Sequence, residues 1–232
     1  MADKHLSSQF DAELNSISTR VLEMGGLVES QARQVIYALH HHSLETCDQI
    51  LAAEEKVNRL EVEIDHDVTS TMSRRQPTAR DLRLLVGVSR ILVNLERAGD
   101  EAASIARMFK LILESGHRAL PTTELRVAIE LAAAALQKSL DAFARLDVVQ
   151  ALEIIKADEQ IDAEYEGFLR KLITYMMEDP RKITPSLDLL FLAKAIERVG
   201  DHAKNIAESI IYIVKGEDVR HTPMATVEKL AQ

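Results

Sequence analysis

The sequence contains few of the residues that β-rich proteins need. Its 232 residues include 8 glycines, 5 prolines, 4 tyrosines, 5 phenylalanines and no tryptophan. Sandwiches and barrels require turn residues about every 8–12 positions and strands rich in aromatic or β-branched side chains. The scarcity of both therefore predicts a helical protein.

Other absences exclude further classes. The single cysteine, Cys47, excludes an internal disulfide framework and a cysteine-rich zinc site, and it fits a reducing compartment. No stretch approaches about 18 uninterrupted apolar residues, so we expect no membrane-spanning helix. The segment Met1–Asp11 has no apolar signal core, so we expect a cytoplasmic protein rather than a secreted one.

Positive charge is also scarce. Lys and Arg total 28 against 37 Asp and Glu, which gives a formal net charge of −9. Nucleic-acid binding depends on the neutralisation of phosphates by basic residues. The acidic balance therefore argues against a nucleic-acid partner, although it permits a local basic patch.

Apolar residues recur at steps of three and four through most of the chain. This spacing is typical of one buried face of a helix. It predicts six long helices, three on each side of the linker Gly116–Pro121. Capping residues and glycines mark where several of them should begin or end. These expected caps and stops are Ser43, Gly116, Asp147, Thr184 with Pro185, and Gly216.

The second half of the chain repeats the first. The second of the six predicted helices aligns with the fifth at a shift of 104 positions, so that Ser43 aligns with Asp147. In helices three and six the shift is 101, and Glu96–Asp100 meets Glu197–Asp201. A change of register confined to one loop is typical of a duplicated unit.

The apolar stripe along one face of each predicted helix and the duplication of the sequence together predict the fold class. We expect an all-α protein made of two tandem three-helix bundles, with six long helices. The first repeat is expected at residues 1–116 and the second at 117–216. Residues 217–232 are predicted to be a polar tail that is held only loosely.

Each repeat carries the motif Glu-Arg-x-Gly-Asp. Carboxylates at i and i+4 share a helix face, so each pair suits a hard cation. The glycine before the aspartate allows a neighbouring helix or ligand to approach closely. The alternative is a solvated face with ion pairs to the motif arginine. Because the motif is duplicated, we predict that iron, manganese, magnesium or zinc binds there, with Glu96, Asp100, Glu197 and Asp201 as ligands.

Helices two and five offer additional carboxylates. Pairs spaced i and i+4 recur on both helices, and Glu54 and Asp158 fall on the apolar stripes themselves. A charge at a bundle seam is costly unless it is paired or bound to a metal. An interhelical salt bridge is the alternative to a ligand role. The additional candidate metal ligands are Glu61, Asp65, Asp162 and Glu166.

An arginine-rich loop follows helix two. The loop Ser73–Arg83 has four arginines and one acidic residue, whereas the matching loop Glu178–Ser186 is nearly balanced in charge. We predict a docking patch for an acidic partner. The alternative is a solvated loop whose arginines cap helix carbonyls. The four residues of this predicted patch are Arg74, Arg75, Arg80 and Arg83.

Signatures of catalysis are missing. The chain has no glycine-rich phosphate loop, no nucleophile elbow and no His-Glu-x-x-His motif. We therefore favour a non-enzymatic signalling adaptor. A metal-dependent enzyme built on the paired carboxylates and a purely structural bundle are the alternatives.

Several segments closely resemble the PhoU family. They are Arg75–Arg83, the two Glu-Arg-x-Gly-Asp motifs and Tyr175–Asp179, and the resemblance extends from Phe10 to His221. It implies two tandem three-helix bundles and a cytoplasmic negative regulator of the phosphate starvation response. It also implies a link between the ATPase subunit of the phosphate transporter and a sensor histidine kinase. We expect a homodimer that associates peripherally with these membrane complexes.

The resemblance also bears on the metal prediction. Some relatives bind multinuclear iron or other metals at Glu/Asp-x-x-x-Asp motifs. Both Glu-Arg-x-Gly-Asp motifs match that pattern, and so does the pair Glu61 and Asp65. In helix five Tyr165 stands opposite Glu61, so the second site departs from the pattern.

Overall fold

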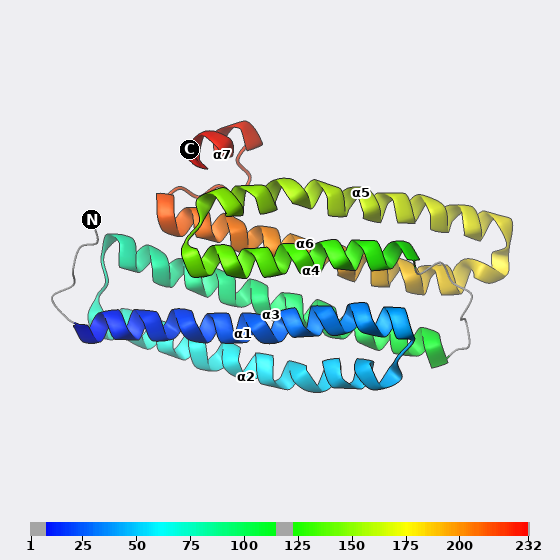
Figure 1. Ribbon diagram of the computed structural model, residues 1–232, viewed down its shortest axis with the longest axis horizontal. Coiled ribbons are helices and arrows are strands. Elements are labelled where there is room, and N and C mark those ends of the chain that lie inside the picture. The colour runs from blue at the N-terminus through cyan, green and yellow to red at the C-terminus, as the bar shows by residue number, and fades with distance from the viewer. Residues whose placement is uncertain (1–7, 115–122, 232) are drawn as a thin grey trace.

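The computed structural model describes residues 8–114 and 123–231 and contains only helices, turns and loops in that part of the chain. Six long helices run along the long axis of an elongated body (Figure 1), which confirms the all-α prediction. The elements are α1 (Ser8–His41), α2 (Leu44–Arg75), α3 (Ala79–Glu114), α4 (Thr123–Arg145), α5 (Val148–Glu178), the 3₁₀ helix η1 (Pro180–Lys182), α6 (Ile183–Lys215) and α7 (Met224–Ala231).

The six long helices form two three-helix bundles. Helices α1, α2 and α3 pack together, as do α4, α5 and α6, so the predicted tandem bundles are confirmed. The bundles also contact each other, through α3 with α6 and through α1 with α4 (Figure 1). Their apolar stripes join in a single buried core that includes Leu95 of α3 and Ile206 of α6.

A glycine allows α3 and α6 to approach closely. A Cβ atom on Gly87 would lie only 2.3 Å from Cγ1 of Ile213 on α6. That distance is far below van der Waals contact, and Ile213 is itself buried. A larger residue at position 87 would require the side chain of Ile213, or α6 itself, to shift.

Helix ends follow most of the local signals in the sequence. Ser43 and Asp147 accept hydrogen bonds from backbone N–H groups three residues further on, at 3.2 and 3.0 Å. Gly216 ends α6 in the left-handed conformation, with φ of 81°. These three predictions are confirmed. Gly116 and the linker around it lie outside the described residues.

The predicted start of the last long helix is wrong. We expected Thr184 to be the cap and Pro185 the first helical residue, whereas α6 begins at Ile183, directly after η1. Asp179 caps η1 by accepting from the backbone N–H of Arg181 at 3.0 Å, and the turn continues into α6. Pro185 therefore lies in the first turn, where a helix needs no N–H donor.

The expectation of a loose tail is also wrong. Residues 217–231 include α7, which packs on α5. Val219 and Val227 are each only 3% exposed, and Glu228 of α7 forms an ion pair with Lys156 of α5 at 2.5 Å. Burial of these two valines stabilises a segment whose composition alone is polar.

None of the helices in the described residues combines the length and apolar character needed to cross a membrane.

Candidate functional site

The first repeat gathers four carboxylates between α2 and α3. Glu96 and Asp100 lie one turn apart on α3, and Glu54 and Glu61 of α2 interact with them electrostatically. The side chain of Glu54 is only 16% exposed, and its nearest cation is Arg107, whose Nη1 lies 3.8 Å from Oε2. We call these four residues the first carboxylate cluster.

The positive charge around the first cluster is too small to balance its four carboxylates. Burial, a hydrogen bond to Asp100 and the charge of Asp100 raise the pKa of Glu54 to about 7. Burial and the charges of Asp100 and Glu61 raise the pKa of Glu96 to about 7 as well. The pKa of Glu61 is raised chiefly by burial. Near neutral pH the cluster therefore holds protons that a metal ion would displace.

The second repeat supplies its own cations to the equivalent carboxylates. Asp158 of α5 is only 4% exposed, and Nζ of Lys204 lies 2.6 Å from its Oδ2. Nζ of Lys194 lies 2.6 Å from the carboxylate of Glu197. The same ammonium group lies over the ring of Tyr165, 5.3 Å from its centroid. Asp158, Asp162, Glu197 and Asp201 form what we call the second carboxylate cluster.

The lysines only partly balance this cluster. Burial and the charges of Glu197 and Asp158 raise the pKa of Asp201 to about 6, and Lys194 opposes the rise. Burial also raises the pKa of Asp162. The second cluster thus has the same number of carboxylates as the first, and two ammonium groups among them.

This difference between the repeats is visible in the sequence. At the shift of 101, Lys194 and Lys204 of α6 stand opposite Val93 and Ala103 of α3. The first repeat therefore has no lysine at either position. Aligning the two motifs beyond their five residues would have revealed the asymmetry.

The motif glycines serve helix packing, as one of the two predicted roles requires. A Cβ atom on Gly200 would lie 2.7 Å from Cδ1 of Ile161 on α5. On Gly99 it would lie 3.2 Å from Oε1 of the buried Gln31 on α1. In both repeats the glycine admits a side chain from a neighbouring helix.

Two predicted ligands lie at the edge of the clusters. Asp65 is exposed and reaches the first cluster only through its charge, which acts on Glu61. Glu166 is 67% exposed and pairs with Arg170 at 3.5 Å. Within residues 8–114 and 123–231, no three His, Cys, Asp or Glu side chains are arranged to hold a metal. The ligand roles therefore stay predictions.

Comparison with known proteins identifies the family. The family model of the PhoU domain matches residues 21–109 and 125–210, one match in each repeat. The chain belongs to the PhoU family. It is 44% identical over its full length to a Burkholderia protein named "Phosphate-specific transport system accessory protein PhoU homolog", covering 98% of that protein. It is 42% identical to the Escherichia coli K12 accessory protein PhoU, over 98% of this chain and 94% of the relative.

Solved PhoU structures have the same fold. The crystal structure of PhoU from Pseudomonas aeruginosa superposes with a TM-score of 0.87 at 40% identity, covering 90% of this chain and all of the other. The regulatory protein PhoU from Streptococcus pneumoniae gives a TM-score of 0.83 at 28% identity, over 90% of this chain and 99% of the other. Both Glu-Arg-x-Gly-Asp motifs lie inside the matched PhoU domains.

The four arginines of the predicted patch have different environments. Arg75 forms an ion pair with Glu13 of α1 at 2.6 Å, and Arg74 lies 3.9 Å from the same carboxylate. Arg83 packs against the end of α6. Arg80 is exposed and forms no ion pair with any residue that the structure describes. The patch that remains open to a partner is centred on Arg74 and Arg80.

Proposed function

We propose that this protein is a non-enzymatic accessory regulator of phosphate transport. The observation that carries the proposal is identity of 42–44% over nearly the whole length to relatives named as phosphate-specific transport system accessory proteins. In this role it acts in the cytoplasm as an adaptor between the ATPase subunit of the phosphate transporter and a sensor histidine kinase. When phosphate is plentiful, it holds the kinase in its inactive signalling state.

The two ends of the molecule suit two different partners. The loop after α2 and the loop after α5 lie at opposite ends of the body (Figure 1). The first end carries the exposed Arg74 and Arg80. The second carries exposed apolar side chains on the last turns of α5 and the first turns of α6, an arrangement typical of interaction surfaces. These are Ile173, Met177, Ile183, Leu187 and Phe191.

Co-purification with variants at each end tests the adaptor. We expect the full chain to retain both the transporter ATPase and the kinase from phosphate-replete cells. R74A with R80A should weaken one contact, most strongly at low ionic strength, and M177S with F191S should weaken the other. Val62→Ser, 68% exposed on α2, is the control for the apolar pair. Unchanged retention of both partners by all variants would refute the two-ended adaptor.

Gene deletion tests the regulatory role separately. Cells that lack the gene should express phosphate-starvation genes in high phosphate, and the intact gene should restore repression. Unchanged expression after deletion would rule out a negative regulator.

We also propose that the first carboxylate cluster binds a divalent or trivalent metal. Its support is the donor set of hard oxygens and the raised pKa values of Glu54 and Glu96, since a cation relieves both burial and repulsion. The metal would link α2 to α3. In the second cluster a metal has to displace Lys194 and Lys204, so we expect lower occupancy there.

Metal analysis of paired variants tests this second candidate. After identical loading and desalting, Glu96→Gln should lose most of the bound manganese or iron, and Glu197→Gln should lose little. The two substitutions affect equivalent motif positions, so each is the control for the other. Equal metal content in the wild type and Glu96→Gln would remove the first cluster from the site.

A further inference from the structure

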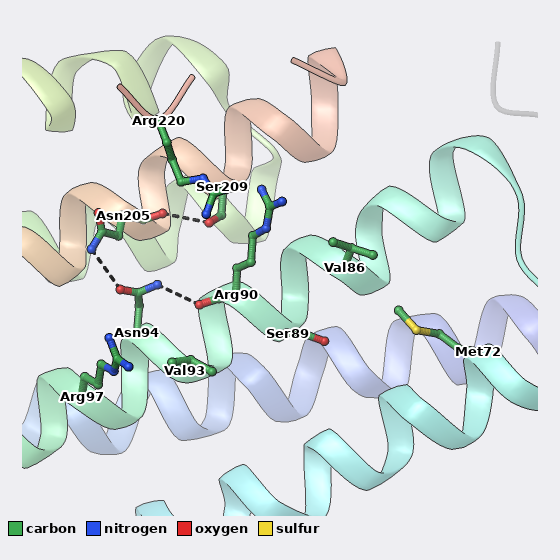
Figure 2. Close-up of a pocket in the computed structure, with 10 residues that line it drawn as sticks. All are labelled: Met72, Val86, Ser89, Arg90, Val93, Asn94, Arg97, Asn205, Ser209 and Arg220. Carbon is green, nitrogen blue, oxygen red and sulfur yellow. Dashed lines mark hydrogen bonds between the residues drawn. The ribbon is translucent and has the colours of Figure 1, made fainter. Parts of the chain in front are cut away.

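A pocket of about 500 Å³ lies on the seam between the two repeats, between α3 and α6. We call it the seam pocket. Figure 2 shows Arg90 and Arg97 leaving α3 on either side of Asn94, while Arg220 reaches in from the segment after α6. Asn205 of α6 lies across from Asn94. None of the eight clustered carboxylates is among the described residues that line this pocket.

The seam pocket holds more positive than negative charge. Its lining in the described part of the chain contains three arginines and no carboxylate. Asp218 forms ion pairs with two of these arginines, at 2.6 Å with Arg220 and at 3.4 Å with Arg90. Arg97 has no hydrogen bond or ion pair with a described residue. The lining of the pocket therefore has a local excess of positive charge, although the whole chain carries a net −9. From outside this lining, Glu96 and Glu208 act on Arg97 and Arg220 only through their charge.

Among the described residues, Arg97 has no ion-pair partner like that of Arg198, because the repeats differ at one position. In the second repeat Arg198 donates to Glu101 of α3 at 2.8 Å. The residue that matches Glu101 at the shift of 101 is His202, so Arg97 faces an imidazole where a carboxylate would pair with it. Burial, Arg97 and Arg198 lower the pKa of His202 to about 4, so the ring is neutral near pH 7.

Hydrogen bonds fix the floor of the seam pocket. Oδ1 of Asn94 accepts from Nδ2 of Asn205 at 3.2 Å, and Nδ1 of the neutral His202 lies 3.1 Å from the same oxygen, placed to donate. Nδ2 of Asn94 donates to the backbone carbonyl of Arg90 at 2.8 Å (Figure 2). These bonds hold α3 and α6 in register, so the positions on α3 that carry Arg90 and Arg97 are fixed before any ligand arrives.

We infer that the seam pocket binds the phosphoryl group of a small anion. Guanidinium forks match tetrahedral oxyanions and are the usual choice for phosphate recognition. The volume lies within the range of small-molecule sites and exceeds what a bare ion fills. Val86 and Val93 provide an apolar wall beside the arginines for an organic group. Free phosphate and a phosphate ester share this chemistry.

Calorimetric titration of the full chain tests the inference. The protein is first treated with a chelator, so that an anion bound through a metal at the carboxylate clusters is not counted. Inorganic phosphate and AMP are the probes, at low ionic strength. We expect saturable binding at one site, weakened at least tenfold in Arg97→Gln. Arg59→Gln, which removes the same charge from an exposed arginine on α2, should bind as the wild type does.

The two probes distinguish the sources of the phosphoryl group. If AMP binds no more tightly than phosphate, the ligand is the free ion. If AMP binds more tightly, and Val93→Ser weakens AMP but not phosphate, the ligand is an ester. The absence of saturable binding at millimolar concentrations, or equal losses in Arg97→Gln and Arg59→Gln, would overturn the inference. Because binding is measured on the purified chain, its failure leaves the regulatory proposal standing.

Discussion

At the scale of single residues, the two carboxylate clusters show how one motif acquires two electrostatic environments. Glu96 and Glu197 occupy equivalent positions, yet only Glu197 has an ammonium group 2.6 Å away. In the first repeat burial and the charges of Asp100 and Glu61 raise the pKa of Glu96. The same backbone therefore carries a proton-holding cluster in one repeat and an ion-paired cluster in the other.

The first cluster makes stability depend on pH. Burial and Asp100 raise the pKa of Glu54 and Glu96 from 4.5 to about 7. A raised carboxyl pKa contributes stability that is complete below the unfolded value and is lost as pH rises through the folded value. In metal-free buffer we expect the wild type to lose this contribution between about pH 4.5 and 7, and E54Q with E96Q to lack it. Urea unfolding at several pH values measures the difference.

A matched variant separates this effect from other titrations. Glu55→Gln, on the same helix but 84% exposed, should leave the profile unchanged. Asp201, with a pKa of about 6, acts in the same direction as the first cluster. His202, with its pKa lowered to about 4, contributes stability that is lost as pH falls from 6.5 towards 4. Both groups remain in every variant, so parallel profiles for wild type and the double variant would contradict the prediction.

The second cluster depends on Lys204. Lys204→Met leaves Asp158 buried without its cation, and the loss of one partner of a buried pair costs about 3 kcal/mol. Lys156→Met breaks an exposed pair with Glu228 and should cost less than about 1 kcal/mol. Chemical denaturation compares the two variants. K204M with D158L should recover most of the loss, and equal stability of the two single variants would count against a buried ion pair.

Part of the two carboxylate clusters could be predicted from the sequence, and the rest could not, because it depends on how the helices pack. Duplication of the motif singled out Glu96 and Asp100, and Glu54 was noticeable because it interrupts an apolar stripe. The pairing of Lys194 with Glu197 joins residues three positions apart on α6, and a comparison of the two repeats beyond the motif would have found it. The pairing of Lys204 with Asp158 depends on which helix faces which, and a pattern within one helix carries no such information. The outward position of Glu166 was missed for the same reason.

At the scale of helices, the sequence predicted those helix ends that are set by hydrogen bonds between residues close together in the chain. Ser43, Asp147 and Gly216 act through bonds within a few positions of themselves, and all three were predicted. The start of α6 was not, because η1 extends the helical turn through a segment that contains a competing Thr-Pro signal. Helix α7 was missed because it has only eight residues and packs on α5, far away in the sequence.

The C-terminal segment should respond to substitution as part of the core. Val219→Asp replaces a side chain that is 3% exposed, and the lost burial alone amounts to about 2 kcal/mol. Val149→Asp, at a position 60% exposed on α5, should change stability by less than about 0.5 kcal/mol. Thermal unfolding followed by circular dichroism measures both. A loosely held tail would give two variants with the same melting temperature.

At the scale of the whole molecule, the two repeats share one core and should unfold together. Gly87→Ala places a methyl group against Ile213 and should lower stability by about 1 kcal/mol or more, with a single cooperative transition. Gly167→Ala is the control, because its new methyl group would have no atom within 4 Å apart from its two chain neighbours and the nearby backbone of its own helix. It should raise stability by up to about 1 kcal/mol. Two separate transitions, or a stabilised Gly87→Ala, would show that the repeats are independent.

The shared core also has a mechanical meaning. With 36 residues, α3 spans about 54 Å, and α6 runs antiparallel beside it over most of that length (Figure 1). Two helical bundles that lie side by side and are packed together along their length resist bending far more than two bundles joined by a hinge. Proteins that grip opposite ends of this body are kept at a fixed separation. A movement of one bound protein is then transmitted to the other, because the helical body between them has no hinge that could absorb the movement.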